Sequence, residues 1–144
     1  MSCAGTRPTD LGVRNGRLAP CSHRPNCVSS DATDAPHAIS PLVLRISPPE
    51  GWAAARIALA ELPRTRVIAA TADYLRAESS SALLGFVDDV ELHLRAEEGL
   101  IAVRSASRLG FGDMGVNRRR IDMLRAILVQ RGVAESAPRS DQTP

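Results

Sequence analysis

The stretch that decides the fold is residues 86–110, which read FVDDVELHLRAEEGLIAVRSASRLG. In its first half, Val90, Leu92 and Leu94 alternate with polar residues, and this period of two is typical of a strand with one buried and one hydrated face. A second alternating segment covers residues 100–109 after a short polar interruption. The stretch therefore predicts two antiparallel strands joined as a hairpin.

The connection between these two strands determines their register. A two-residue turn at residues 98–99 pairs core positions with core positions, whereas a slip of one residue would pair a buried side with a hydrated side. With this turn, Asp89 lies opposite Arg108 and His93 lies opposite Arg104, all on the hydrated face. Opposite charges across strands would stabilise the sheet by a few tenths of a kcal/mol, up to ~1 kcal/mol.

The segments outside the hairpin predict two more strands and two helices. Residues 67–70 and 74–79 have the composition of strands. Apolar residues recur at helical spacing over residues 52–62, where Pro63 ends the pattern, and again over residues 117–132, with asparagine as N-cap and glycine after the end. The expected fold is α+β and two-layered, with a four-stranded antiparallel meander flanked by two helices in the order helix, strands, helix.

A chain of 144 residues has the usual size of one domain. Residues 1–38 are rich in Pro, Ser, Asp and Thr and predict an extended, partly disordered N-terminal segment that carries a cysteine motif. Residues 39–132 form the single α+β domain, and residues 133–144 are expected to be a disordered tail.

The composition excludes several classes of function. All 18 basic residues are arginines, so Schiff-base chemistry, a Walker-type phosphate loop and a lysine general base are ruled out. One Trp, one Tyr and two Phe provide few stacking surfaces, and no nucleic-acid partner is expected. No apolar stretch reaches the ~20 residues of a membrane span, and the N-terminus lacks the apolar core of a signal peptide. We therefore expect a cytoplasmic protein without a membrane span.

The cysteines and histidines near the N-terminus do not form a recognisable metal motif. Cys21, His23, Cys27 and His37 lack the Cys-x(2–4)-Cys spacing of structural zinc sites, so no metal is expected. In the cytoplasm the two cysteines are expected to be free thiols, whereas an oxidising compartment would allow a disulfide between them. A free Cys27 could also act as a nucleophile if the fold placed a base beside it.

Gly110, Gly112 and Gly115 form a literal G-x-G-x-x-G between a predicted strand and a predicted helix. A dinucleotide-binding unit also needs a second parallel strand after the helix, with an acid near its end, and here only a polar tail follows. The glycines therefore predict a tight turn, and no cofactor is expected.

Three runs of the sequence are shared with one known family: Pro-Asn-Cys-Val-Ser-Ser at residues 25–30, Phe-Val-Asp-Asp-Val-Glu at residues 86–91, and Arg-Ser-Ala-Ser-Arg onward to Gly-Val-Asn-Arg at residues 104–118. Because all three runs occur together, the chain resembles the family called domain of unknown function 1499 (DUF1499), over roughly residues 11–131. The motif positions that match are Cys21, Cys27, Ser29, Ser30, Asp88, Asp89, Arg104, Ser105, Ser107, Arg108, Asp113, Asn117 and Arg118.

The resemblance implies a protein of bacteria or plastids with no assigned activity, in a family whose members sometimes carry N-terminal targeting or membrane segments. His23 and Arg24 stand where the family more often has small or acidic residues, which argues against a metal role for His23 as a family trait. The motif around Cys27 is expected to dock near the sheet, and if it lies beside Arg108 the two residues belong to one site.

The strongest candidate site is a group of arginines around the glycine turn: Arg104, Arg108 and the arginines at residues 118–120. Cations at a helix N-terminus oppose the helix dipole unless they meet acids or a bound anion. Free N–H groups and guanidinium groups there would suit a carboxylate, phosphate or sulfate. We therefore predict an anion site.

The alternative is a purely structural network. Asp88, Asp89, Glu91 and Asp113 could pair with these arginines, and Arg118 with the acid four residues later on the helix. Successive helical residues also point about 100° apart, so three consecutive arginines cannot all face one ligand.

Three functions follow as hypotheses. The first is a non-catalytic binding domain for a small anionic ligand, the second a hydrolase or isomerase with one of two neighbouring aspartates as general base, and the third a protein-interaction module with a structural polar network. The candidate ligand-binding residues are Arg104, Arg108, Asn117, Arg118, Asp88, Asp89, Ser105, Ser107 and Asp113.

Overall fold

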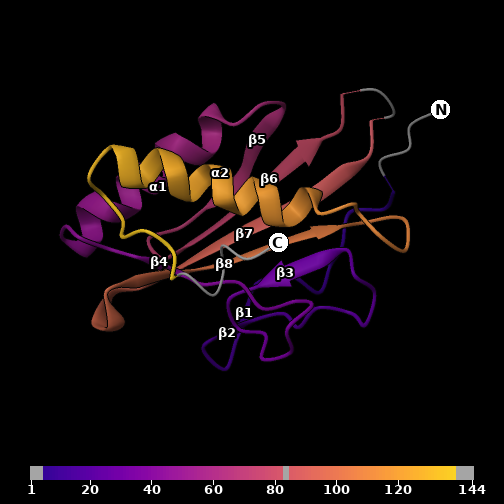
Figure 1. Cartoon of the computed structure of the whole chain (residues 1–144), viewed down its shortest axis with the longest axis horizontal. Coiled ribbons are helices and arrows are strands. Elements are labelled where there is room, and N and C mark those ends of the chain that lie inside the picture. The colour runs from indigo at the N-terminus through magenta and orange to yellow at the C-terminus, as the bar shows by residue number, and fades with distance from the viewer. Residues whose placement is uncertain (1–4, 83–84, 139–144) are drawn as a thin grey trace.

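The computed structural model describes residues 5–82 and 85–138 of the chain and has a six-stranded sheet at its centre (Figure 1). The strands run in the order β3-β8-β7-β6-β5, and β4 also pairs with β8. They are β3 (Cys27–Ser29), β4 (Leu42–Val43), β5 (Thr65–Ala70), β6 (Tyr74–Ser80), β7 (Val87–Arg95) and β8 (Leu100–Ser107). The α+β class is confirmed, and β5 to β8 are the predicted strands. The prediction of only four strands is wrong, because β3 and β4 extend the sheet along β8.

The β7–β8 hairpin has the predicted faces but not the predicted register. The short 3-10 helix η1 (Ala96–Glu98) and a left-handed glycine after it form the connection, which is longer than the predicted two-residue turn. Arg104 therefore lies opposite Glu91 instead of His93. The pairing is displaced by two residues, and an even displacement leaves every side chain on its own face of the sheet.

The two helices are α1 (Pro48–Glu61) and α2 (Val116–Gln130). Helix α1 begins before the predicted residue 52, because its two prolines occupy the first helical positions, where a missing N–H costs nothing. The predicted N-cap role of Asn117 is wrong. Asp113, which precedes α2, accepts hydrogen bonds from backbone N–H groups at the start of the helix. The side chain of Asn117 does not cap the helix and points inward.

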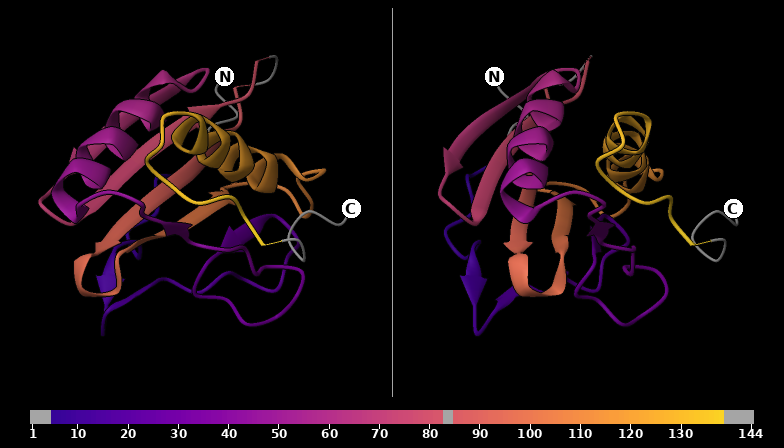
Figure 2. Two further views of the ribbon diagram at one scale, coloured as in Figure 1. Left: turned by 60° about the vertical axis from the view of Figure 1, so that its left-hand side comes forward. Right: turned by 90° about the vertical axis from the view of Figure 1, so that its left-hand side faces the viewer.

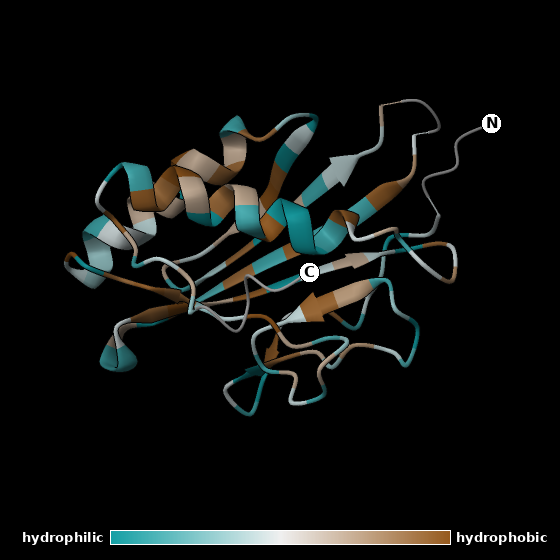
Figure 3. Ribbon diagram, viewed as in Figure 1, coloured by the Kyte–Doolittle hydropathy of each residue, from teal (hydrophilic) through white to brown (hydrophobic). Residues whose placement is uncertain are grey.

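Both helices pack on one face of the sheet, as the turned views in Figure 2 show. Apolar residues recur along the helices and the strands (Figure 3). The fully buried large residues of this core include Leu59 of α1, Leu124 and Leu128 of α2, and Leu75 and Leu92 of the sheet. The core therefore lies between the helices and the sheet, as predicted for a layered α+β domain.

The other face of the sheet is covered by the N-terminal part of the chain. This segment forms a small hairpin of β1 (Val13–Arg14) and β2 (Arg17–Leu18) and then enters the main sheet as β3. Side chains on that face, including those of Glu91 and Arg104, bond to backbone groups of the segment. The strands before α1 were not predicted, because they are too short to show an alternating pattern.

Within residues 5–82 and 85–138, the structure has no helix with the length and apolar character needed to cross a membrane.

Candidate functional site

Asn117 on α2 is fully buried and connects the helix to the sheet. Its Oδ1 accepts hydrogen bonds from Ser105 Oγ at 2.7 Å and Arg120 Nη1 at 2.8 Å. Its Nδ2 donates to Ser107 Oγ at 2.9 Å, to Asp113 Oδ2 at 2.8 Å and to a main-chain carbonyl of the N-terminal segment at 3.1 Å. Every polar atom of this side chain is therefore used within the fold.

Arg120 and Asp113 extend the contacts of Asn117. Arg120 Nη2 donates to Asp88 Oδ2 at 2.7 Å, and its Nη1 also donates to Ser105 Oγ at 3.1 Å. Burial alone would raise the pKa of Asp113, but the hydrogen bonds from Asn117 and from the backbone N–H groups at the start of α2 lower it. We call these residues, together with Ser107, the helix-side network.

The other two arginines at the start of α2 point elsewhere. Arg118 Nη2 donates to the carbonyl of Ala38 at 2.9 Å instead of pairing with Asp122, and Arg119 Nη1 donates to the carbonyl of Met114 at 2.7 Å. The three consecutive arginines thus have three different sets of partners, as their angular spacing predicted.

Arg108 lies on the opposite face of the sheet. Its Nε and Nη2 donate to the two carboxylate oxygens of Asp89, each at 2.8 Å, and Nη2 also bonds to Glu78. The predicted pair of Arg108 and Asp89 forms, although Asp89 is directly opposite Ala106. Glu78 also accepts from Arg7 Nε at 2.7 Å. Hydrogen bonds from Arg7 and Arg108 lower the pKa of Glu78 to about 2, against the effect of burial.

Arg104 lies on the same outer face. Its Nη1 donates to Glu91 Oε2 at 3.3 Å, while Nε and Nη2 donate to the carbonyls of Ala19 at 2.9 Å and Pro20 at 3.2 Å. Glu91 is fully buried and also accepts from Tyr74 Oη at 2.6 Å. Burial, and then the bond to Glu91, raise the pKa of Tyr74. We call these residues, with Arg7, Glu78, Asp89 and Arg108, the outer network.

The sheet separates the predicted site residues into two groups, because neighbouring residues of a strand point to opposite faces. The helix-side network contains Asp88, Ser105, Ser107, Asp113 and Asn117, the outer network contains Asp89, Arg104 and Arg108, and Arg118 belongs to neither. The nine residues therefore do not surround one ligand.

Sequence reasoning missed several members of the outer network. Tyr74 and Glu78 alternate with buried residues along β6, and this pattern could have placed them on the hydrated face beside the partners found on β7. Asp31 also forms an ion pair with Arg95, with contacts of 2.6 and 2.8 Å. No sequence pattern could have predicted this pair, because Asp31 lies in an irregular loop.

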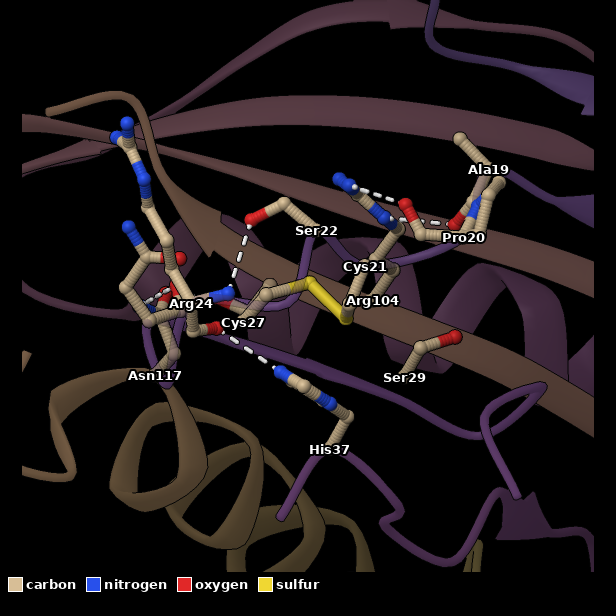
Figure 4. The surroundings of a disulfide bond; sticks show 12 residues. Ala19, Pro20, Cys21, Ser22, Arg24, Cys27, Ser29, His37, Arg104 and Asn117 are labelled. Atoms are coloured by element: carbon tan, nitrogen blue, oxygen red, sulfur yellow. Dashed lines mark hydrogen bonds between the residues drawn. A yellow bond between two sulfur atoms is a disulfide. The ribbon is translucent and has the colours of Figure 1, made fainter. Parts of the chain in front are cut away.

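Cys21 and Cys27 form a disulfide with a Cα–Cα distance of 5.7 Å (Figure 4). Of the two alternatives for these thiols, the structure contains the bonded one, and a bonded Cys27 has no thiolate to act as a nucleophile. Cys27 pairs with Ala106 of β8, so its motif docks on the sheet as predicted. His37 lies against the disulfide loop, and its Nε2 is 2.9 Å from the carbonyl of Arg24.

A hollow of about 320 Å³ opens beside this disulfide, and we call it the disulfide hollow. Its lining residues are Ser22, His23, Arg24, Asn26, Cys27, Arg104, Ala106, Ser107 and Arg108, none of which is a carboxylate. Arg24 is exposed, and the Nη1 group of Arg108 makes none of the hydrogen bonds found among the described residues. Cys27 and Arg108 thus border one space.

Metal binding finds no support in the part of the chain that the structure describes, where no group of three or more His, Cys, Asp or Glu side chains is arranged to hold an ion.

The family model described as "Protein of unknown function (DUF1499)" matches residues 17–128. The chain belongs to this family. Comparison with curated proteins and with solved structures gave no match. The DUF1499 match includes the six strands of the main sheet, helix α1 and all but the last two residues of α2. The two networks and the disulfide hollow therefore lie inside the family domain, apart from the residues before 17.

Proposed function

We propose that this DUF1499 domain is a non-catalytic binding domain for a small anionic ligand, and that the ligand occupies the disulfide hollow. The observation that carries the proposal is the charge of the lining: Arg24, Arg104 and Arg108 border the hollow and no carboxylate does. A space of about 320 Å³ is at the lower end of the range for small-molecule sites.

The arginines of the hollow have different roles in this proposal. Arg104 and Arg108 are held in place from behind by Glu91 and Asp89, so little side-chain entropy is lost when a ligand binds. The free Nη1 of Arg108 offers donors to a carboxylate, phosphate or sulfate oxygen, and Arg24 closes on the ligand from the exposed side.

The alternative of a general base finds less support in the geometry. Asp88 and Asp89 are both buried and each is paired with an arginine, so both carboxylates are engaged in the fold itself. The observations therefore support binding more than catalysis.

The experiment is thermal unfolding of the chain in phosphate, sulfate, dicarboxylates and nucleotides, with the Arg24→Ala variant beside it. A ligand at a hundredfold excess over its Kd adds about 2.7 kcal/mol to the free energy of unfolding. Arg24 is the informative position, because it takes no part in the ion pairs among residues 5–82 and 85–138, whereas loss of Arg108 would disrupt the outer network. Arg56→Ala, an exposed arginine on α1, is the matched control.

A midpoint shift for one anion that disappears in Arg24→Ala and persists in Arg56→Ala is the expected result. If no anion raises the midpoint, or if Arg24→Ala responds as the wild type does, the disulfide hollow is not an anion site and the polar networks are structural.

The disulfide also changes the expected compartment. We infer that the domain works where disulfides persist, rather than in the cytoplasm, which was the expectation from the sequence. The sequence holds three cysteines, so a thiol assay on denatured protein, isolated without reductant from its native cells, should find one reactive thiol. Three reactive thiols would mean that the disulfide is absent in the cell and that the protein works in a reducing compartment.

A further inference from the structure

Exposed apolar side chains gather at one end of the sheet. Among the described residues, the large hydrophobic side chains of Phe86, Leu109, Phe111, Met114 and Val116 are between 39% and 92% exposed. They come from the β6–β7 connection and from the β8–α2 connection with the first residue of α2, and the two connections lie at the same end of the molecule in Figure 1. We call these five residues the apolar tip.

The two connections form one continuous surface. A groove of about 300 Å³ is lined by Phe86 from the first connection and by Leu109, Met114 and Val116 from the second. The backbone N–H of Arg108 donates to the carbonyl of Val87 at 3.3 Å, which joins the two connections at their base. Phe111 and Met114 project furthest, with 68% and 92% exposure.

The backbone at Met114 is in an unfavourable conformation for its side chain. Its φ is 55°, in the left-handed region that glycine and asparagine adopt more readily than methionine. Arg119 Nη1 donates a hydrogen bond to the carbonyl of Met114 at 2.7 Å, so the loop is fixed with the methionine side chain pointing into solvent. A side chain with 92% exposure contributes almost no packing, and the folded monomer gains nothing that would explain a methionine here.

The rim of the apolar tip is positively charged. A neighbouring groove that shares Val116 is lined by Arg64, Arg119 and Arg120. Arg120 is neutralised by Asp88, but Arg64 donates to the carbonyl of Ser80 and Arg119 to that of Met114, with no carboxylate partner found for either within the described residues. Two acids line the groove of the apolar tip: Asp88 pairs with Arg120, and Asp113 accepts hydrogen bonds from N–H groups at the start of α2. The three arginines of the rim outnumber these two acids.

We propose that the apolar tip inserts into the surface of an anionic lipid bilayer. Projecting Phe and Met side chains enter the region between headgroups and acyl chains, and the arginines on the rim contact the lipid phosphates. A second copy of the chain is a poorer partner, because a symmetric contact would bring two positive rims together. The proposal concerns a different surface from the disulfide hollow and does not depend on it.

The test is co-sedimentation with vesicles of equal parts phosphatidylcholine and phosphatidylglycerol, compared with vesicles of phosphatidylcholine alone. The wild-type chain should bind the anionic vesicles more tightly, and added salt should weaken the binding. Met114→Asp should lower partitioning by roughly tenfold or more, since it removes an inserted apolar side chain and adds a negative charge. Ile57→Asp is the matched control, because Ile57 is 57% exposed on α1, away from the tip.

Met114→Asn separates membrane binding from folding. Asparagine tolerates the left-handed conformation, so this variant should melt at the same temperature as the wild type or higher, while its vesicle binding falls. Three results would each overturn the proposal. The wild type would fail to sediment with anionic vesicles, or Ile57→Asp would lose as much vesicle binding as Met114→Asp does. In the third, the wild type would be a dimer that Met114→Asp dissociates, while Met114→Asp binds vesicles as well as the wild type does.

Discussion

Asp88 and Asp89 are neighbours in the chain, but their carboxylates lie on opposite faces of the sheet and pair with different arginines. Asp88 accepts a hydrogen bond from Arg120 on the helix side at 2.7 Å, and Asp89 accepts two from Arg108 on the outer side at 2.8 Å. Two carboxylates share a proton only when they face each other. Asp88 and Asp89 are therefore two independent structural anchors.

The independence of the two aspartates predicts additive effects on stability. Asp88→Asn and Asp89→Asn should each lower the free energy of unfolding by about 2–4 kcal/mol, because each removes a carboxylate charge that faces a largely buried arginine. The double variant should equal their sum to within about 0.5 kcal/mol, since the two share no partner. Urea unfolding of the three variants measures this. A coupling energy above about 1 kcal/mol would mean that the two networks communicate through β7.

The contact of Asn117 with Asp113 predicts a variant that is sensitive to pH. In Asn117→Asp, a carboxylate oxygen replaces the Nδ2 that lies 2.8 Å from Asp113 Oδ2. Repulsion and the lost donor should destabilise the fold by about 3 kcal/mol at pH 7. As the pH falls, one of the two facing carboxyls takes up a proton and can donate again.

The measurement for this variant is the difference from wild type in the free energy of unfolding between pH 7 and pH 4. Both proteins lose stability in acid, and subtracting the wild-type value removes this shared loss. Glu78 contributes to it, because its stabilising effect is lost as the pH falls from 4.5 toward its folded-state pKa of about 2. Asn117→Ala, which lacks a carboxyl, should show no recovery. Recovery in both variants would contradict the assigned role of Asp113.

The alternation of residues 86–110 was enough to predict the central hairpin and its two faces, because burial on one face imposes the period of two. Its register was wrong by two residues, since nothing in that pattern distinguishes a two-residue turn at residues 98–99 from the longer connection through η1. The ion pair of Arg108 with Asp89 formed nevertheless, because a long guanidinium side chain reaches its diagonal neighbour.

The candidate site was only partly predictable, for a different reason. The partners of Arg104 include backbone carbonyls of the N-terminal segment, at Ala19 and Pro20. Carbonyls are present at every position of a chain, so no residue pattern marks the ones that will be used. The sequence marked these arginines and acids as candidates, but it could not show that the sheet divides them or that the N-terminal segment covers one group.

The disulfide is predicted to hold the N-terminal segment on the sheet. Cys21 adjoins the carbonyls that accept from Arg104, and Cys27 is on β3, so the bond between cysteines at a sequence separation of 6 ties the segment to the sheet. Its loss in Cys21→Ser/Cys27→Ser should lower the free energy of unfolding by about 2–3 kcal/mol. Hydrogen exchange should then increase most at the backbone N–H of Gly12, which donates to Glu91 at 2.9 Å.

Two controls test this role of the disulfide. The wild type measured with reductant should behave as the double serine variant does, and the double serine variant itself should not respond to reductant. Unchanged exchange at Gly12 in the reduced protein would show that the contacts of Glu91 and Arg104 are sufficient to hold the segment.

His37 predicts a loss of stability as the pH rises above neutrality. The bond to the carbonyl of Arg24, and then the bond to Asp34, raise the pKa of this buried histidine above its usual 6.5. A raised folded-state pKa means that the folded chain binds more protons, so the stabilisation is complete below pH 6.5 and is lost as the pH rises through the higher folded-state value. The disulfide loop should loosen in the same range, because the imidazolium holds the carbonyl of Arg24.

The midpoint of urea unfolding between pH 5.5 and 9 measures this effect, with His37→Gln as control, because glutamine can donate a hydrogen bond but does not titrate. The difference in the free energy of unfolding between wild type and His37→Gln should decrease as the pH rises through the folded-state pKa. His93 acts in the opposite direction and at lower pH: burial, with Arg95 nearby, lowers its pKa, so its effect lies below pH 6.5 and is common to both proteins. A difference that stays constant above pH 6.5 would mean that His37 remains neutral in the fold and that its bond to Asp34 is not an ion pair.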